Sequence, residues 1–162
     1  MRKIDNWNMG DTEDILYIER MTQSNPLTRK DFLSLVNDSD IMCLVMRENG
    51  LVLGFVLYGI YKFHLNIYTM VVHPDFRKQG IGTSLLEEVK NRVLKHPLRR
   101  VVFLKVRESH LETLYWAKKR GFLAISIDNE AFSVPDEDGI IMKWATPEKA
   151  KQEKGVLEDI TL

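Results

Sequence analysis

Apolar residues in the first part of the chain recur at helical spacing. Between Asp11 and Gln23, Ile15 and Ile18 fall on one face of a predicted helix, and Asp11 stands before them as the expected N-cap. A proline break follows, and Thr28 is then predicted to cap a second helix. The chain is therefore expected to begin with two short amphipathic helices.

Strand-like segments come next. The segments Ile41–Arg47 and Leu51–Ile60 are separated by the turn pair Asn49-Gly50, which is a good β-hairpin signal because these residues tolerate positive φ. A further strand is predicted from about Leu65 to Val72, ending at His73-Pro74. These three strands are expected to pair antiparallel.

The second half of the chain alternates helices and strands. Helical spacing starts at Ile81 and ends at Pro97, and Ser109 opens a capping-box pattern for a helix that closes at Gly121. Three strands are also predicted, over Val101–Val106, Phe122–Ile127 and Ile140–Trp144. This order favours an α/β (α+β) domain with a mixed sheet flanked by helices. We expect this domain to span residues 1–145, with a polar C-terminal tail over 146–162.

Composition and charge narrow the class of protein. The chain has 162 residues, which suits one domain, and its 23 basic and 23 acidic residues give zero net charge. No overall field therefore attracts nucleic acid or an anionic membrane. A single cysteine, Cys43, lies in an apolar run and is interpreted as a core thiol, which excludes a disulfide framework and a cysteine metal cluster. With no signal peptide and no apolar run near 18 residues, a cytoplasmic protein is predicted.

The most informative segment joins the strand ending at Val72 to the helix beginning at Ile81. Main-chain N–H groups at a helix start are unpaired and carry partial positive charge. Gly80 and Gly82 would leave these donors open to an anion, and basic residues precede them in the turn. The pattern predicts a pyrophosphate site. A Walker A loop and a dinucleotide fingerprint both fail to fit, whereas a solvated turn before an ordinary helix stays an alternative.

The turn Arg77-Lys78-Gln79-Gly80-Ile81-Gly82 resembles the Gln/Arg-x-x-Gly-x-Gly/Ala signature of the GCN5-related N-acetyltransferase (GNAT) family. The similarity extends from about Asp11 to Trp144, and it looks most like the branch that acetylates protein N-termini, including ribosomal-protein alanine acetyltransferases. The resemblance implies a mostly antiparallel mixed sheet that is splayed between the strands ending at Val72 and Val106.

The same resemblance implies acetyl transfer from acetyl-CoA to a primary amine, either a protein or peptide N-terminus or a small amine. It implies no metal and no nucleic acid. Its cofactor-binding positions correspond here to Met70, Val71, Val72, Arg77, Lys78, Gln79, Gly80, Ile81, Gly82, Thr83 and His110. His110 stands where the family usually has an asparagine that contacts the cofactor arm; a solvent-facing histidine is the alternative.

The family's usual catalytic side chains are missing from the sequence. Ala117 occupies the position of the tyrosine that protonates the leaving thiolate, and Tyr115 lies about 200° away around the helix. Lys105 stands where the ribosomal-protein branch has a glutamate base. The remaining candidates for catalysis are Tyr68 and Glu19 as bases and Tyr115 as the acid. A catalytically weak or inactive acetyl-CoA-binding regulatory protein is therefore the alternative function.

The acceptor side of the site is predicted to include an acidic loop. The segment Asn129–Gly139 contains Glu130, Asp136, Glu137 and Asp138, which would suit a cationic acceptor. A run of solvated acidic residues is the alternative interpretation. The oligomeric state is left open by the sequence.

Overall fold

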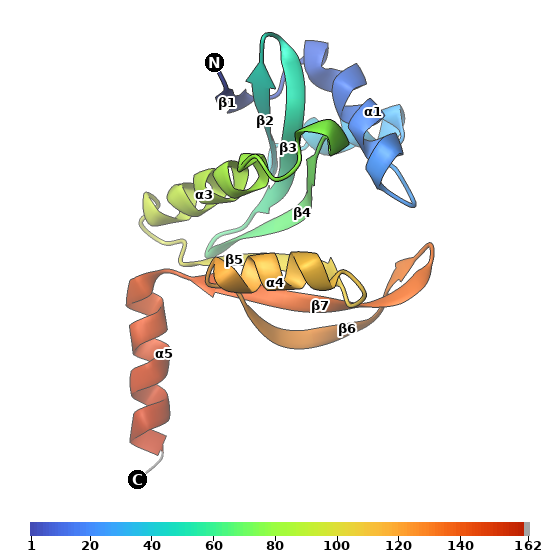
Figure 1. Ribbon diagram of the computed structural model, residues 1–162. Helices are drawn as coiled ribbons and strands as arrows, with labels where there is room; N and C mark the ends of the chain where they lie inside the picture. The colour runs from blue at the N-terminus through green and yellow to red at the C-terminus, as the bar shows by residue number, and fades with distance from the viewer. Residues whose placement is uncertain (161–162) are drawn as a thin grey trace. The chain divides into compact units, whose positions relative to one another are not determined.

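The computed structural model describes residues 1–160, which form seven β-strands, five α-helices and two short 3-10 helices (Figure 1). The chain divides into two compact units. The first unit comprises residues 1–61 and 66–90, and the second comprises residues 62–65 and those from Asn91 onward. Within residues 1–160, no helix is long and apolar enough to cross a membrane.

The sheet of the first unit follows the order β1-β2-β3-β4. Its strands are β1 (Lys3–Asn6), β2 (Ile41–Glu48), β3 (Leu51–Ile60) and β4 (His64–Val72). The β2–β3 pair is the predicted hairpin, with positive φ at Asn49 (51°) and Gly50 (79°). These two residues supply the backbone twist that a tight hairpin requires, so the prediction is confirmed.

The helices of the first unit begin close to the predicted residues. They are α1 (Thr12–Thr22), α2 (Arg29–Val36) and α3 (Ile81–Leu94), the last of which ends in the second unit. Thr28 caps α2 by accepting a hydrogen bond from the Asp31 N–H at 3.1 Å, as predicted. Asp11 occupies the N-cap position of α1, but its side chain does not cap α1 within residues 1–160. Its carboxylate binds Arg47 instead, with Oδ1 at 2.7 Å from Nε.

The core of the first unit lies between α1, α2 and the sheet. Ile15, Phe32 and Phe55 are fully buried there, and Trp7 packs edge-on against the Phe32 ring at 5.4 Å between centroids. Cys43 belongs to the same cluster and is 2% exposed, which confirms its predicted place in the core. Burial raises the pKa of its thiol to about 12, so the thiolate needed for nucleophilic chemistry is suppressed at neutral pH.

The second unit has an antiparallel sheet in the order β5-β7-β6. Its strands are β5 (Val101–Arg107), β6 (Leu123–Ser133) and β7 (Asp136–Ala145), with α4 (Leu111–Lys119) and α5 (Pro147–Ile160). The last two strands were predicted too short. The structure continues both strands through the segment that was expected to be an acidic loop.

Arg107 explains why β6 and β7 are longer than predicted. Its guanidinium donates hydrogen bonds to the carbonyls of Val134 and Pro135 and lies over the Phe132 ring at 4.2 Å. It also forms an ion pair with Glu137 at 3.2 Å. These contacts join the hairpin end to β5, which lies far away in sequence, so local sequence patterns could not reveal them.

The start of α4 also differs from the predicted capping box. The N-cap is His110 rather than Ser109, and within residues 1–160 the His110 side chain makes no capping hydrogen bond. Ser109 instead donates its N–H to Glu137 Oε1 at 2.5 Å. The helix ends as predicted at Gly121, whose φ is 88°. An added Cβ at Gly121 would lie 3.2 Å from the Trp144 ring, so the glycine also permits close packing against β7.

Candidate functional site

The β4–α3 connection is anchored to the sheet immediately after β4. The His73 N–H donates to the Leu53 carbonyl at 2.8 Å, and Pro74–Phe76 then form a short 3-10 turn. His73 Nδ1 accepts a hydrogen bond from the Asp75 N–H at 3.1 Å. The imidazole therefore shapes the connection, and this ring nitrogen is already occupied.

The exposed residues 77–80 then turn the chain into α3. Lys78 and Gly80 both have positive φ, at 58° and 81°. No described atom lies within 4 Å of a Cβ added at Gly80, so the surface beside its main chain is open. Ser84 N–H donates to the Gly80 carbonyl at 2.9 Å. The N–H groups of residues 81–83 therefore precede the hydrogen-bond ladder of α3, which is the geometry that binds anions.

Gly54 allows this helix start to approach the sheet, and the sequence analysis did not single it out for that role. A Cβ at Gly54 would lie 2.9 Å from the Val71 carbonyl oxygen and 3.0 Å from Ile81 Cγ2. Both distances are shorter than side chains tolerate, so only glycine fits here. The available signal was a glycine inside a strand, which often marks a close backbone approach.

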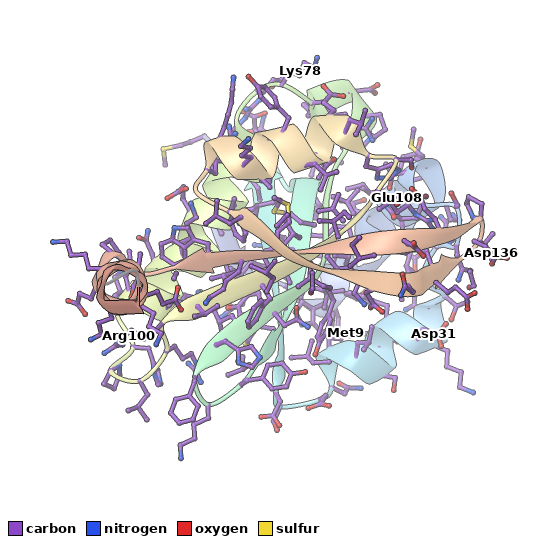
Figure 2. All side chains as sticks on the ribbon, turned by 90° about the horizontal axis from the view of Figure 1, so that it is seen from below. Met9, Asp31, Lys78, Arg100, Glu108 and Asp136 are labelled. Atoms are coloured by element: carbon purple, nitrogen blue, oxygen red, sulfur yellow. The ribbon has the colours of Figure 1, made fainter. Side chains whose placement is uncertain are left out.

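Three basic residues meet at this turn. Arg77 and Lys78 are exposed within it, and Figure 2 labels Lys78 at the edge of the molecule. Arg2 arrives from the other end of the sequence, because its guanidinium donates to the side-chain oxygen of Gln79. Arg2 also lies 3.5 Å from the Glu48 carboxylate. The turn thus combines open main-chain donors with positive charge, and this combination fits a pyrophosphate.

Glu19 is a buried carboxylate on α1. The residue is 2% exposed, and its Oε2 accepts a hydrogen bond from the Leu27 N–H at 3.1 Å. Its other oxygen, Oε1, is buried and has no hydrogen-bond partner among the residues that the structure describes. Desolvation by burial raises the pKa of this carboxyl group, although the Leu27 hydrogen bond opposes the shift. A raised pKa brings the pKa of a carboxyl group closer to neutral pH, where a general base is most effective.

Tyr68 is half-exposed on β4 and lies across Gly59 of β3, where an added Cβ would sit 2.4 Å from the tyrosine oxygen. Its hydroxyl is 2.7 Å from the hydroxyl of Tyr61. This hydrogen bond, together with burial, raises the pKa of Tyr68 to about 12. A hydroxyl with that pKa stays protonated at neutral pH, which favours a donor role over the predicted role as a base.

The candidates in the second unit are side chains around α4 and β5. Tyr115 is 61% exposed, with the Lys119 ammonium 4.7 Å from its ring centroid, and His110 is exposed at the helix start. Ala117, at the family's tyrosine position, is fully buried. Lys105 forms an ion pair with Asp128 at 2.6 Å. This ion pair ties Lys105 to β6, which fits a structural role for the side chain.

The predicted acidic loop is an ordered part of the β6–β7 hairpin, and Figure 2 labels Asp136 at its tip. Glu137 contacts Arg107 and Ser109, and these hydrogen bonds lower the pKa of its carboxyl group. Asp138 Oδ1 accepts a hydrogen bond from the Glu130 N–H at 2.7 Å. The interpretation as a run of solvated acidic residues therefore holds for the exposed Glu130 and Asp136, but not for Glu137 and Asp138, whose carboxylates hold the hairpin together.

A strand that ends in a basic, glycine-containing turn at a helix N-terminus is an arrangement that suits a phosphate group. The profile of the "Acetyltransferase (GNAT) family" matches residues 2–122 of the chain. The chain therefore belongs to the GNAT acetyltransferase family.

Curated relatives cover most of the chain at low identity. The ribosomal protein bS18-alanine N-acetyltransferase of Escherichia coli K12 is 24% identical over 144 residues, which are 88% of this chain and 96% of the relative. An amino-acid acetyltransferase of Buchnera aphidicola is 27% identical over 128 residues, which are 78% of this chain but 28% of that longer protein. The predicted resemblance to the ribosomal-protein branch is confirmed.

Solved structures confirm the fold. The ribosomal-protein-S18-alanine N-acetyltransferase of Escherichia coli superposes with a TM-score of 0.80 at 23% identity, covering 90% of this chain and 94% of that one. Ard1 from Thermoplasma volcanium gives 0.81 at 21% identity, covering 90% and 97%. Arabidopsis thaliana NAA60, solved with acetyl-CoA, gives 0.79 at 20% identity, covering 90% and 98%. The predicted fold class is therefore correct, and acetyl-CoA is the donor of the family.

Proposed function

We propose that this protein transfers the acetyl group of acetyl-CoA to a primary amine, with protein or peptide N-termini as the first candidates and small amines as the second. The observation that carries the proposal is the open helix start after Gly80, with its main-chain donors and basic residues. The names of the bS18-alanine N-acetyltransferase and of the amino-acid acetyltransferase support this choice of acceptors. We further propose that residues 1–145 suffice for the activity and that the protein acts in the cytoplasm.

In this proposal, the N–H groups from Lys78 to Thr83 bind the pyrophosphate, and Arg77 and Arg2 add charge. The pantetheine arm follows the main chain of Met70–Val72 on β4. Because these contacts are mostly main-chain contacts, the exposed side chain of Gln79 is free to vary without loss of binding, whereas the side chain of Ile81 is buried. His110 is kept as a proposed contact to the donor.

The transfer itself is proposed to be a direct attack. The amine nitrogen bonds to the thioester carbonyl carbon, the carbon–sulfur bond breaks, and coenzyme A leaves as a thiolate that takes a proton from water or from Tyr115. The amine loses its own proton to Glu19, whose unpaired oxygen and raised pKa make it the strongest candidate base. Tyr68 would serve as a hydrogen-bond donor.

Isotope transfer from labelled acetyl-CoA to a panel of N-terminal peptides and small amines tests this function. We expect transfer by the wild-type protein and its loss in Gly82→Trp, in which a bulky ring covers the helix start. Ser84→Ala, at an exposed position two residues later in α3, is the matched control and should keep activity. Equal transfer by Gly82→Trp and wild type would overturn the proposed donor site.

A binding protein without turnover is the second candidate, and two observations favour it. Ala117 supplies no acid at the predicted tyrosine position. Lys105 is held in an ion pair with Asp128. Calorimetry with acetyl-CoA, followed by a thiol-release assay with the amine panel, separates the two functions. Binding with no thiol release on any amine would establish the regulatory function.

A further inference from the structure

Two exposed tyrosines stand together beside the β3–β4 pair of the first unit. Tyr61 directly follows β3 and is 44% exposed, and Tyr68 lies on β4 and is 48% exposed. Their hydroxyl oxygens are 2.7 Å apart. Tyrosine gives a partner a large and rigid contact area at low cost in conformational entropy, so this tyrosine pair is a preformed surface for a ligand.

Gly59 makes room for one ring of the tyrosine pair. A Cβ at Gly59 would lie 2.4 Å from the Tyr68 hydroxyl oxygen and 2.8 Å from two of its ring carbons, so a larger residue would displace the ring. The phenol end of Tyr68 therefore rests on the bare main chain of β3, which lies beside β4 in the sheet (Figure 1). The exposed part of the ring is left open to a ligand.

The loop between α2 and β2 brings carboxylates to the tyrosine pair. The Ile60 N–H, next to Tyr61 in the chain, donates to the Asp40 carbonyl at 2.7 Å. Asp38 Oδ1 accepts a hydrogen bond from the Asp40 N–H at 2.8 Å. The Tyr61 hydrogen bond, burial and then the charge of Asp38 raise the pKa of Tyr68, so this carboxylate lies close enough to act on the hydroxyl.

The charge around the tyrosine pair is negative. Asp38 and Asp40 are exposed, and neither forms an ion pair in the part of the chain that the structure describes. The adjacent cation, Lys62, places its ammonium 5.1 Å from the Phe63 ring centroid. The faces of aromatic rings attract positive charge, and carboxylates add a Coulomb attraction. The surface therefore favours a cation over an anion or a neutral group.

The tyrosine pair also lies on the strand that is proposed to hold the donor. In that proposal the pantetheine arm follows Met70–Val72, starting from the turn that leads into α3. A strand rises by about 3.3 Å per residue, so Tyr68 lies about 7 Å beyond Met70 in the direction away from the turn. A molecule that reacts at the acetyl end of the arm therefore has its other groups within reach of the tyrosine pair.

We propose that the tyrosine pair, together with Asp38 and Asp40, binds a positively charged group of the acceptor other than the amine that is acetylated. The choice of ligand rests on the proposed acetyl transfer. The preferred acceptors then carry a second positive charge, either as a basic side chain near a peptide N-terminus or as the other ammonium of a diamine.

Calorimetry with paired peptides tests the cation site without any transfer. The two peptides of a pair differ only by lysine or norleucine at the second, third or fourth residue, and coenzyme A replaces acetyl-CoA. We expect the wild type to bind the best lysine peptide at least about fivefold more tightly than its norleucine partner. A diamine and a monoamine of equal length give the same comparison for small acceptors.

Variants of the cation site should lose this preference. Asp38→Asn keeps an oxygen for the Asp40 N–H but removes a charge, and Tyr68→Ala removes a ring, so each should reduce the preference to less than about twofold. Glu13→Gln is the matched control, because it removes an exposed carboxylate from α1 of the same unit and should keep the full preference. Equal affinity of the wild type for both members of every pair, no detectable binding of any of them, or an unchanged preference in both variants would overturn the proposal.

Isotope transfer to the same peptides separates the cation site from the acetyl transfer itself. Binding at the tyrosine pair should lower the KM of the lysine peptide and leave kcat nearly unchanged. A lysine preference in calorimetry without any transfer would support the cation site and contradict the proposed function. Transfer with an equal KM for both peptides would support the proposed function and contradict the cation site.

Discussion

The β4–α3 and β5–α4 connections both lead from a strand into a helix, but the two helices begin in different ways. At α3, positive φ values at Lys78 and Gly80 bring main-chain donors to an open surface. At α4, the N-cap His110 makes no side-chain capping bond within residues 1–160, and the preceding N–H of Ser109 is occupied by Glu137. The first connection has an open surface beside Gly80, whereas the second uses the Ser109 N–H to hold a hairpin.

This difference gives a physical reason for the prediction that the first connection keeps the family pattern and the second departs from it. Binding through main-chain N–H groups requires a backbone path, which Gly54 and Gly80 secure, and it tolerates varied side chains. Acid and base catalysis requires particular side chains at particular positions. If the positions predicted from the family resemblance are right, the sequence keeps this backbone path and has Ala117 and Lys105 in place of the family's catalytic side chains. Donor binding and catalysis can therefore change independently in this fold.

The largest expected effect is at Gly54. In Gly54→Val, the Cβ meets the Val71 carbonyl and Ile81, and we expect a loss of about 1–3 kcal/mol of stability because the core is overpacked. The start of α3 should be displaced, and acetyl-CoA binding measured by calorimetry should fall below detection. The control is Gly50→Asn, which keeps a positive φ at the open β2–β3 turn and should bind normally. Normal acetyl-CoA binding by a folded Gly54→Val protein would contradict the role of Gly54 in positioning the start of α3.

The next effect concerns catalysis by a side chain of the first unit. If Glu19 is the base, Glu19→Gln should lower kcat by about 10²-fold or more while acetyl-CoA affinity stays the same. The pKa of Glu19 is raised above its ordinary value of 4.5, so wild-type activity should fall as pH decreases through that higher value.

The contribution of Glu19 to folding stability changes with pH in the opposite direction to its contribution to activity. A raised carboxyl pKa favours folding below pH 4.5, and this contribution is lost as pH rises through the folded pKa. Glu19→Gln should therefore gain stability relative to wild type as pH rises, as measured by urea unfolding at pH 4 and pH 8. An unchanged kcat would limit Glu19 to anchoring the Leu27 N–H.

The third prediction has a smaller effect. It distinguishes the main-chain and side-chain contributions of the β4–α3 turn to acetyl-CoA binding. Gly80→Val forces a branched side chain to a φ of 81°, which costs about 1–2 kcal/mol and should weaken acetyl-CoA binding about tenfold. Gln79→Ala removes only a side chain, and its affinity should change by less than about twofold by calorimetry, a few tenths of a kcal/mol. Equal effects of the two substitutions would show that side chains, and not main-chain donors, bind the donor.

The fold was predictable where its signals are local. The β2–β3 hairpin was found because Asn49 and Gly50 lie between the strands that they join. The β6–β7 hairpin was predicted too short because its end is held by Arg107, a residue of β5. A pattern read along neighbouring residues contains no information about such a contact.

The candidate site shows the same limit. The spacing of Gly80 and Gly82 predicted a turn with an exposed main chain before α3, and the structure has this turn. The contribution of Arg2 was not predictable, because Arg2 reaches Gln79 across 77 positions of sequence. The unpaired oxygen of Glu19 was not predictable for a different reason. Burial depends on how the core packs, and residue type and spacing do not determine it.

The fourth prediction tests how the second connection holds its hairpin. Hydrogen bonds to Ser109 and Arg107 lower the pKa of Glu137 below 4.5, so its contribution to folding is present above pH 4.5 and is lost as pH falls through the folded pKa. The protection factor of the Ser109 amide, which is its exchange rate corrected for the intrinsic pH dependence, should therefore fall at acid pH in the wild type. Glu137→Gln should exchange fast at every pH, whereas Glu148→Gln, on α5, should behave like the wild type. Slow exchange in Glu137→Gln would mean that the hairpin is held by other contacts.

The smallest effect should come from giving α4 the cap that it lacks. His110→Asn supplies a short side chain that can accept a hydrogen bond from the first turn, and it should raise the free energy of unfolding by about 1 kcal/mol. His110→Ala, which removes a side chain without a capping bond, should leave stability nearly unchanged. Thermal unfolding of the three proteins measures both values. Because asparagine is also the residue that the family usually has here, the same variant shows whether the second connection contacts acetyl-CoA. Tighter binding by His110→Asn would assign it a direct contact, and unchanged binding would leave the β4–α3 connection as the donor site.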